Sequence, residues 1–192
     1  KAKASGYDGI EIWSPTDKKE QIQISKLLKE QNMKVIFPCG SDPKLSFEKS
    51  LVAYKKYLKN TFELNPIAIN SHTGSDFYSF GQNMTFIEEA AKLSKYYKIP
   101  VYHETHRGRF SYSLPKTIEY IEKNKDLVLT LDISHWMVVH ESLLLERTDL
   151  LEKIIERSNH IHARVGYEEG PQVNDPIAPE WRSVVNRHMD IW

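Results

Sequence analysis

Six short apolar runs alternate with helical patterns along the chain, and this alternation limits the possible folds more than any other feature. The runs cover residues 9–13, 34–37, 66–70, 101–104, 128–132 and 160–163. Each run has the length of a strand and is followed by a segment with apolar residues at helical spacing. Strands that alternate with helices in this way are typical of a parallel sheet covered by helices, so the sequence predicts an α/β fold.

Helix signals mark the segments between the runs. Thr16 and Asp17 precede a helical pattern over residues 18–31, and a second pattern covers residues 46–60. Thr85 and Glu88 have the spacing of a capping box and predict the start of a third helix. Pro115 fits the first position of a fourth helix, and residues 141–158 predict a long fifth one.

The two faces of the predicted strands differ in polarity. Leu129 and Leu131 alternate with Thr130 and Asp132, so that one face is aliphatic and the other becomes polar toward the end of the strand. A doubly wound sheet carries aliphatic residues on both faces, and the asymmetry therefore favours a closed (β/α)8 TIM barrel. Eight units of about 30 residues give the usual length of about 250. We therefore expect residues 1–192 to form one partial barrel domain that lacks the first and eighth strands.

Composition excludes several classes of protein. The 26 basic and 26 acidic residues balance, which provides no net charge for binding a nucleic acid. Cys39 is the single cysteine, which fits a reducing compartment, and no apolar run is long enough to cross a membrane. We expect a cytoplasmic protein that contacts neither nucleic acid nor membrane.

Three metal-ligating residue types stand at the ends of consecutive apolar runs. Glu104, Asp132 and His162 are separated by 28 and 30 residues, the length of one strand and one helix. Parallel strands end at the same edge of a sheet, so the three side chains should converge and form a site for a divalent metal. The alternatives are an ion pair of Glu104 with a nearby arginine, and Asp132 as the cap of the turn that follows it.

Three more residues are candidates for contacts to a substrate. His72 follows the third apolar run, His135 stands three residues after Asp132, and Arg164 shares a strand face with His162. Arg164 could bind a hydroxyl, a carboxylate or a phosphate, or it could pair with Glu11. His72 could equally be an isolated histidine at the rim.

Five motifs in this order resemble the xylose isomerase-like TIM barrel superfamily, which includes AP endonuclease 2 folds, and most of all its sugar phosphate isomerase/epimerase-like branch. They are Tyr7-Asp8-Gly9-Ile10-Glu11, Asn70-Ser71-His72-Thr73-Gly74, Glu104 with Thr105-His106-Arg107-Gly108-Arg109, Asp132 with His135, and the run from His160 to Arg164. The resemblance implies one divalent ion (Mn, Mg, Zn or Co) on Glu104, Asp132 and His162. A fourth ligand, a glutamate of the eighth strand, has no counterpart in this sequence.

The resemblance also implies a reaction. A metal-dependent isomerase or epimerase of a sugar or sugar phosphate would move a proton through an enediolate, with Glu104 as both ligand and proton shuttle. His135 and Arg164 would position hydroxyl groups, and a homodimer is a further expectation. The first alternative is a sugar-binding barrel without catalysis. The second is an endonuclease of the superfamily with three zinc ions, but Cys39 and Asp175-Pro176-Ile177 stand where two of its ligands belong.

Overall fold

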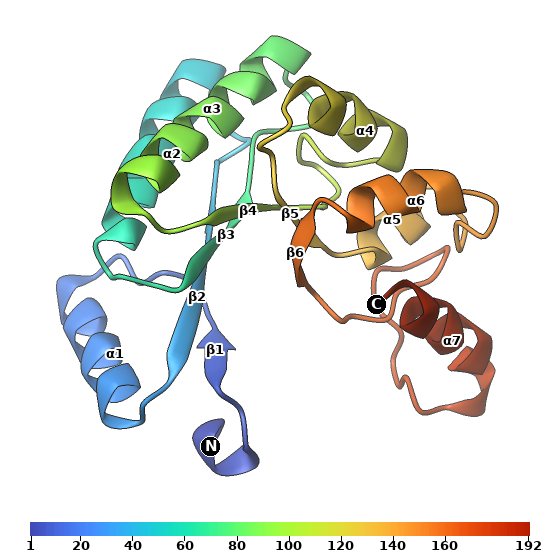
Figure 1. Cartoon of the computed structure of the whole chain (residues 1–192), viewed down its shortest axis with the longest axis horizontal. Coiled ribbons are helices and arrows are strands. Elements are labelled where there is room, and N and C mark those ends of the chain that lie inside the picture. The colour runs from blue at the N-terminus through green and yellow to red at the C-terminus, as the bar shows by residue number, and fades with distance from the viewer. The chain divides into compact units, whose positions relative to one another are not determined.

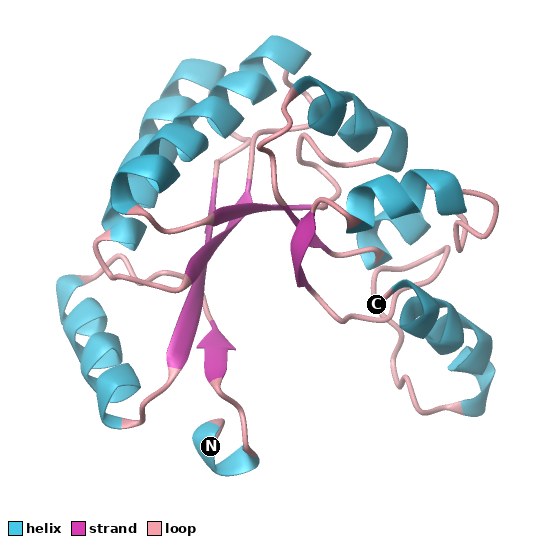
Figure 2. Ribbon diagram, viewed as in Figure 1, coloured by secondary structure: helices cyan, strands magenta, loops and turns pink.

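The computed structural model describes residues 1–192 and divides them into two compact units. Unit 1 comprises Lys1–Gly74 and Gly81–Val101, and unit 2 comprises Ser75–Phe80 and Tyr102–Trp192. Both units consist of parallel strands that alternate with helices (Figure 2). The expectation that residues 1–192 form one domain stays a prediction.

Unit 1 contains three strands in the order in which they occur in the chain. They are β1 (Gly9–Glu11), β2 (Lys34–Gly40) and β3 (Ala68–His72). Its helices are the 3-10 helix η1 (Lys3–Ser5), α1 (Lys18–Glu30), α2 (Phe47–Phe62) and α3 (Phe80–Tyr97), of which only Phe80 belongs to unit 2. β1 pairs with β2 and β2 with β3, both in parallel. The start of α1 agrees with the predicted signal, because the Asp17 carboxylate accepts hydrogen bonds from the first turn of the helix.

The core of unit 1 contains several aromatic rings. α2 and α3 lie side by side (Figure 1), and the Phe86 ring of α3 packs edge-on against Phe47 and Tyr54 of α2. Phe62, at the end of α2, stacks on Tyr97 with ring centroids 4.7 Å apart. The apolar spacing in residues 46–60 therefore correctly marked the buried face of α2.

Unit 2 also contains three parallel strands in chain order. They are β4 (Val101–Glu104), of which only Val101 belongs to unit 1, β5 (Leu129–Leu131) and β6 (Ser158–Ile161). Its helices are α4 (Leu114–Lys123), α5 (Ser134–Val139), α6 (Thr148–Ile155), the 3-10 helix η2 (Pro179–Trp181) and α7 (Arg182–Ile191). Trp136 of α5 is fully buried, as are Leu129 and Ile154. No helix in the structure has the length and apolar character that crossing a membrane requires.

Two helix predictions were wrong. The third helix begins at Phe80 rather than Thr85, whose hydroxyl donates to the Gly81 carbonyl inside the helix. Residues 141–158 do not form one long helix, because α5 ends at Val139 and α6 starts only at Thr148. Glu141 has a left-handed backbone with φ of 46°, and this conformation ends a helix.

Candidate metal centre

Three consecutive strands of unit 2 deliver the predicted metal ligands to one edge. Glu104 is the last residue of β4, Asp132 directly follows β5, and His162 directly follows β6. β4 and β5 pair in parallel with Glu104 beside Thr130, and β5 and β6 pair with Leu131 beside Ile161. Because the strands run in the same direction, their C-terminal residues meet.

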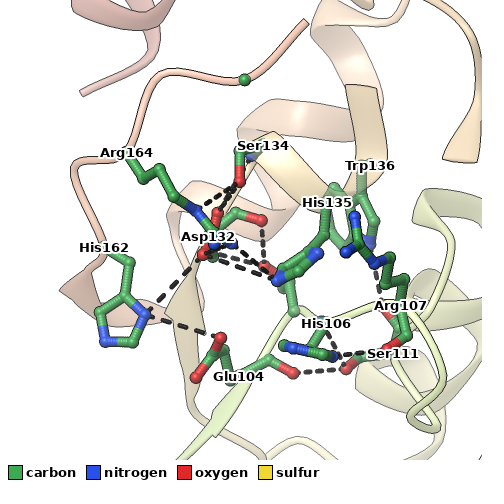
Figure 3. Close-up of polar contacts among 12 residues, drawn as sticks. Glu104, His106, Arg107, Ser111, Asp132, Ser134, His135, Trp136, His162 and Arg164 are labelled. Atoms are coloured by element: carbon green, nitrogen blue, oxygen red, sulfur yellow. Dashed lines mark hydrogen bonds and ion pairs between the residues drawn. The ribbon is translucent and has the colours of Figure 1, made fainter. Parts of the chain in front are cut away.

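The structure brings the three side chains together. His162 Nδ1 lies 3.6 Å from Glu104 Oε1 and 3.9 Å from Asp132 Oδ2 (Figure 3). One ligand atom from each residue lies within 4.8 Å of the other two. A single ion can span atoms at this spacing, because its bonds to nitrogen and oxygen are about 2.0–2.2 Å long.

Both carboxylates are almost completely buried. Glu104 is 3% exposed and Asp132 is 2% exposed. Burial raises the pKa of Asp132 above its usual range, and the nearby Glu104 carboxylate raises it further, whereas Ser134 and Arg164 act in the opposite direction. Burying two adjacent carboxylates costs free energy unless a cation compensates their charge, so the electrostatics of the cluster favour a bound cation.

Asp132 is held in place by its neighbours. Its Oδ1 atom accepts hydrogen bonds from the Ser134 hydroxyl and from the Ser134 amide, the latter at 3.2 Å. Its amide donates to Thr105 Oγ1 at 2.8 Å, and the same hydroxyl donates back to the Asp132 carbonyl. Asp132 therefore does stabilise the turn before α5, as the structural alternative predicted, but only one of its carboxylate oxygens is used for that.

Arg164 contacts the other oxygen of Asp132. Its Nη2 donates to Asp132 Oδ2 at 2.6 Å and to His135 Nε2 at 2.8 Å. Its Nε donates to Ser134 Oγ at 3.1 Å. The predicted substrate residue Arg164 thus lies directly at the cluster, and so does His135.

His135 is a buried neutral histidine. Burial lowers its pKa to about 2, and the neighbouring His106, Arg164 and Arg107 lower it further. A guanidinium can only donate, so Nε2 of His135 must accept from Arg164 and the proton must sit on Nδ1.

His106 is a site residue that the sequence reasoning did not select. Its ring centroid lies 3.9 Å from that of His135, and Glu104, His106 and His135 form a second group with ligand atoms within 4.8 Å of one another. The signal was present in the sequence, because residues two apart on an extended backbone point to the same side and His106 stands two residues after Glu104.

The loop that carries His106 is fixed to the strand ends. Ser111 Oγ donates to the carbonyl of Glu104, and Trp136 Nε1 donates to the carbonyl of Ser111 at 2.8 Å. Trp136 and Ser111 are fully buried. The first turn of α5 therefore positions this loop beside Glu104.

His72 belongs to the other unit. It is the last residue of β3, and its ring lies 5.1 Å from that of Trp13, which is 56% exposed. Its predicted contact to a substrate stays a prediction.

The donor set fits a divalent metal. Two carboxylates and one imidazole suit Mg²⁺, Mn²⁺, Zn²⁺ and Co²⁺ better than softer ions, which prefer thiolates. If these three residues held an ion, coordination positions would remain for a substrate, as in catalytic metal sites.

Comparison with known proteins agrees with the family resemblance noted in the sequence. A model of the family described as "Xylose isomerase-like TIM barrel" matches residues 1–191. No curated protein sequence matches the chain.

Several solved structures share the fold. A D-tagatose 3-epimerase-like protein has a TM-score of 0.67 and 17% identity, with 97% of this chain and 79% of that chain covered. A probable 3-DHS dehydratase of petrobactin synthesis from Bacillus anthracis has a TM-score of 0.63 and 16% identity, covering 93% and 70%. A xylose isomerase-like TIM barrel protein from Mycobacterium smegmatis, solved with magnesium, has a TM-score of 0.63 and 11% identity, covering 99% and 76%. These matches confirm the predicted α/β fold, a partial barrel of the xylose isomerase-like type.

Proposed function

Because the chain belongs to the xylose isomerase-like TIM barrel family, we propose that it is a divalent-metal-dependent isomerase or epimerase of a sugar or sugar phosphate. The observation that carries the proposal is the convergence of Glu104, Asp132 and His162, with two nearly buried carboxylates in one group. A relative with magnesium bound and an epimerase-like relative support this assignment.

Glu104, Asp132 and His162 would hold the ion. A bound divalent ion would supply Lewis-acid chemistry, which makes a proton next to a substrate carbonyl more acidic. The Glu104 carboxylate would take that proton from one carbon to give an enediolate. Return of the proton to the neighbouring carbon would shift the carbonyl in an isomerase, whereas its return to the opposite face of the same carbon would invert the centre in an epimerase. Arg164 and His135 would donate hydrogen bonds to substrate oxygens, and His72 remains a proposed substrate contact.

The first experiment measures metal and proton exchange. Purified protein is analysed for metal content and then incubated with a panel of ketoses in heavy water with Mn²⁺ or Mg²⁺. We expect one metal per chain and incorporation of deuterium at carbon in at least one sugar. Sugar binding without exchange would instead identify a non-catalytic binding barrel, and the proposal would be wrong.

Glu104→Gln tests the proposed base. The variant keeps the size of the side chain but cannot accept the proton, so we expect exchange to fall by about 10²-fold or more while the thermal transition stays in place. Glu119→Gln, on the exposed face of α4, is the matched control and should retain exchange. Exchange at the wild-type rate in Glu104→Gln would exclude Glu104 as the base.

Elimination of water is a second candidate reaction, and the position of His106 favours it. His106 is two residues after Glu104 and lies against His135, so that an imidazole adjoins the proposed base. After Glu104 removes the proton next to a carbonyl, a hydroxyl on the adjacent carbon could leave with a proton from His106, which releases water. One structural relative is a probable dehydratase. An unsaturated product in the same incubations would favour elimination, whereas exchange with retention of all hydroxyls would favour epimerisation.

A further inference from the structure

We propose that Arg164 is an exchangeable counter-charge of the metal centre: its guanidinium pairs with Asp132 Oδ2 and leaves this oxygen when a divalent cation binds. The inference rests on the proposed function, because it assumes that Glu104, Asp132 and His162 hold the metal. It assigns Arg164 a role in metal loading in addition to its proposed contact with a substrate.

The two oxygens of Asp132 have separate partners. Oδ1 accepts from the amide and the hydroxyl of Ser134. Oδ2 lies 3.9 Å from His162 Nδ1, the nitrogen that is also 3.6 Å from Glu104 Oε1. Arg164 Nη2 donates to this same Oδ2 at 2.6 Å. Arginine thus occupies the oxygen that faces the other proposed ligands.

The charges explain why Arg164 is there. Glu104 and Asp132 are almost fully buried, and a buried negative pair requires a positive partner. A guanidinium is always charged, so Arg164 can neutralise the pair when no metal is present. A divalent cation in the cluster would supply the same compensation and would repel the guanidinium at close range.

The surroundings of Arg164 allow the exchange. Its side chain is 33% exposed, whereas that of Asp132 is 3% exposed, so the guanidinium is the partner that can move. Nε donates to Ser134 and Nη2 donates to His135 as well as to Asp132. When the bond to Asp132 is lost, these two residues still hold the side chain near the cluster, and an Nη2 donor becomes available for a substrate oxygen.

The direction in which the metal affinity changes on removal of Arg164 distinguishes a competing counter-charge from a residue that orients a metal ligand. Residues that merely orient a metal ligand strengthen metal binding, and their removal weakens it by about 10–100-fold. A competing counter-charge weakens metal binding, so its removal should strengthen it. Arg164→Met removes the charge and keeps most of the length of the side chain.

The experiment is titration of chelator-treated protein with Mn²⁺ in a calorimeter. We expect Arg164→Met to bind Mn²⁺ about tenfold more tightly than the wild type, a change of about 1.4 kcal/mol. Arg164→Lys keeps the charge and should stay close to the wild type. Arg157→Met is the matched control, because Arg157 holds the Leu127 and Asn124 carbonyls through its guanidinium, and it should leave the Mn²⁺ affinity unchanged.

Thermal unfolding gives an independent measurement. Without metal, Arg164→Met should have a lower melting temperature than the wild type, because the buried carboxylates have lost their counter-charge. Saturating Mn²⁺ should reduce or reverse this difference in melting temperature. If Arg164→Met does not fold, NMR spectroscopy of the wild type provides the test. The Arg164 side-chain signal, assigned by comparison with Arg164→Lys, is followed while Mg²⁺ is added. An unmoved Arg164 signal at Mg²⁺ saturation, or Mn²⁺ affinity equal to or weaker than the wild type in Arg164→Met, would overturn the inference. If the wild type binds no metal at all, the proposed metal centre itself is wrong.

Discussion

At the scale of single residues, the environment of Asp132 determines what the cluster can do. The carboxylate is fixed through Oδ1 and available through Oδ2, as Figure 3 shows with Asp132 between His162 and His135. A ligand held in this way loses little freedom when it binds an ion. If Asp132 binds a metal, we expect Ser134, the residue that fixes it, to matter to the site as much as a direct ligand.

Ser134→Ala should weaken both metal binding and the fold. The variant removes the hydroxyl that donates to Asp132 Oδ1 and accepts from Arg164 Nε. We expect a 10–100-fold loss of Mn²⁺ affinity, roughly the range for residues that orient metal ligands. We also expect the free energy of unfolding to fall by about 1–3 kcal/mol, because a buried hydrogen bond is lost.

Ser158→Ala is the control for this prediction. Ser158 Oγ donates to the Ile154 carbonyl at 2.8 Å. Ser158 stands at the start of β6, whereas the proposed ligand His162 follows the end of that strand. Its removal should change stability but leave Mn²⁺ affinity unaltered in calorimetry. Equal metal affinity in wild type and Ser134→Ala would show that the hydroxyl does not orient Asp132.

At the scale of elements, α5 connects the cluster to its surroundings. Its first turn carries Ser134, His135 and Trp136, which contact Asp132, Arg164 and the loop after β4 respectively. The helix is only six residues long, and its end is unusual. The Ser142 amide donates to the Met137 carbonyl at 3.0 Å across the left-handed Glu141, which is the Schellman arrangement that glycine normally occupies.

The end of α5 also caps another helix. His140 Nε2 accepts a hydrogen bond from the amide of Leu114, the first residue of α4, at 3.0 Å, whereas the preceding Ser113 makes no side-chain cap. Burial lowers the pKa of His140, which keeps this nitrogen available as an acceptor. Two helices distant in sequence are joined in this way.

His140→Ala should destabilise α4. The loss of an N-cap acceptor costs about 0.5–2 kcal/mol, and we expect a decrease of that size in urea unfolding. Lys123→Ala, an exposed position in the last turn of α4, is the control and should change the free energy of unfolding by less than about 0.5 kcal/mol. If the two variants were equally stable, the His140 contact would not act as a cap.

At the scale of the whole molecule, buried neutral histidines link stability to pH. Burial lowers the pKa of His103 to about 3 and is the main reason why that of His135 is about 2. Burial also lowers the pKa of His188, whose Nε2 accepts from the Gly166 amide and whose Nδ1 donates to the Val184 carbonyl. All three stay neutral in the folded chain at pH values where the unfolded chain binds protons.

Stability should therefore fall as the pH falls. Above a pH of about 6.5 the histidines are neutral in both states, and below it the unfolded state gains protons that the folded state lacks. Each such histidine lowers the free energy of unfolding by about 1.4 kcal/mol per pH unit until its folded pKa is reached. The raised pKa of Asp132 acts in the opposite direction, because the folded state then takes up a proton more readily than the unfolded state.

His188→Gln isolates one of these contributions. Urea unfolding of metal-free protein at several pH values between 7.5 and 5.5 should show a smaller loss of unfolding free energy with falling pH for the variant than for the wild type, because the variant lacks a histidine whose pKa is lowered by folding. Glutamine can still accept from the Gly166 amide, so the structure should remain. Identical slopes would mean that His188 is protonated in the folded protein.

The sequence alone was sufficient for the fold class and for the convergence of Glu104, Asp132 and His162. Strand and helix signals are local, and in a parallel α/β chain a constant spacing places consecutive strand ends at one edge. The same reasoning placed His135 and Arg164 near the cluster, because each is a few residues from a ligand. Their roles, like those of the ligands, stay predictions.

Only the tertiary structure decided how these side chains share their partners. That Arg164 takes Oδ2 of Asp132 while Ser134 takes Oδ1 depends on the turn that starts α5 and on the path of the chain after β6. The break between α5 and α6 was missed because a glutamate, rather than a glycine, adopts the left-handed conformation. A hydrogen bond between residues about 30 positions apart, such as that of Arg164 with Asp132, depends on how the elements pack. Local patterns of polarity in the sequence do not predict that packing.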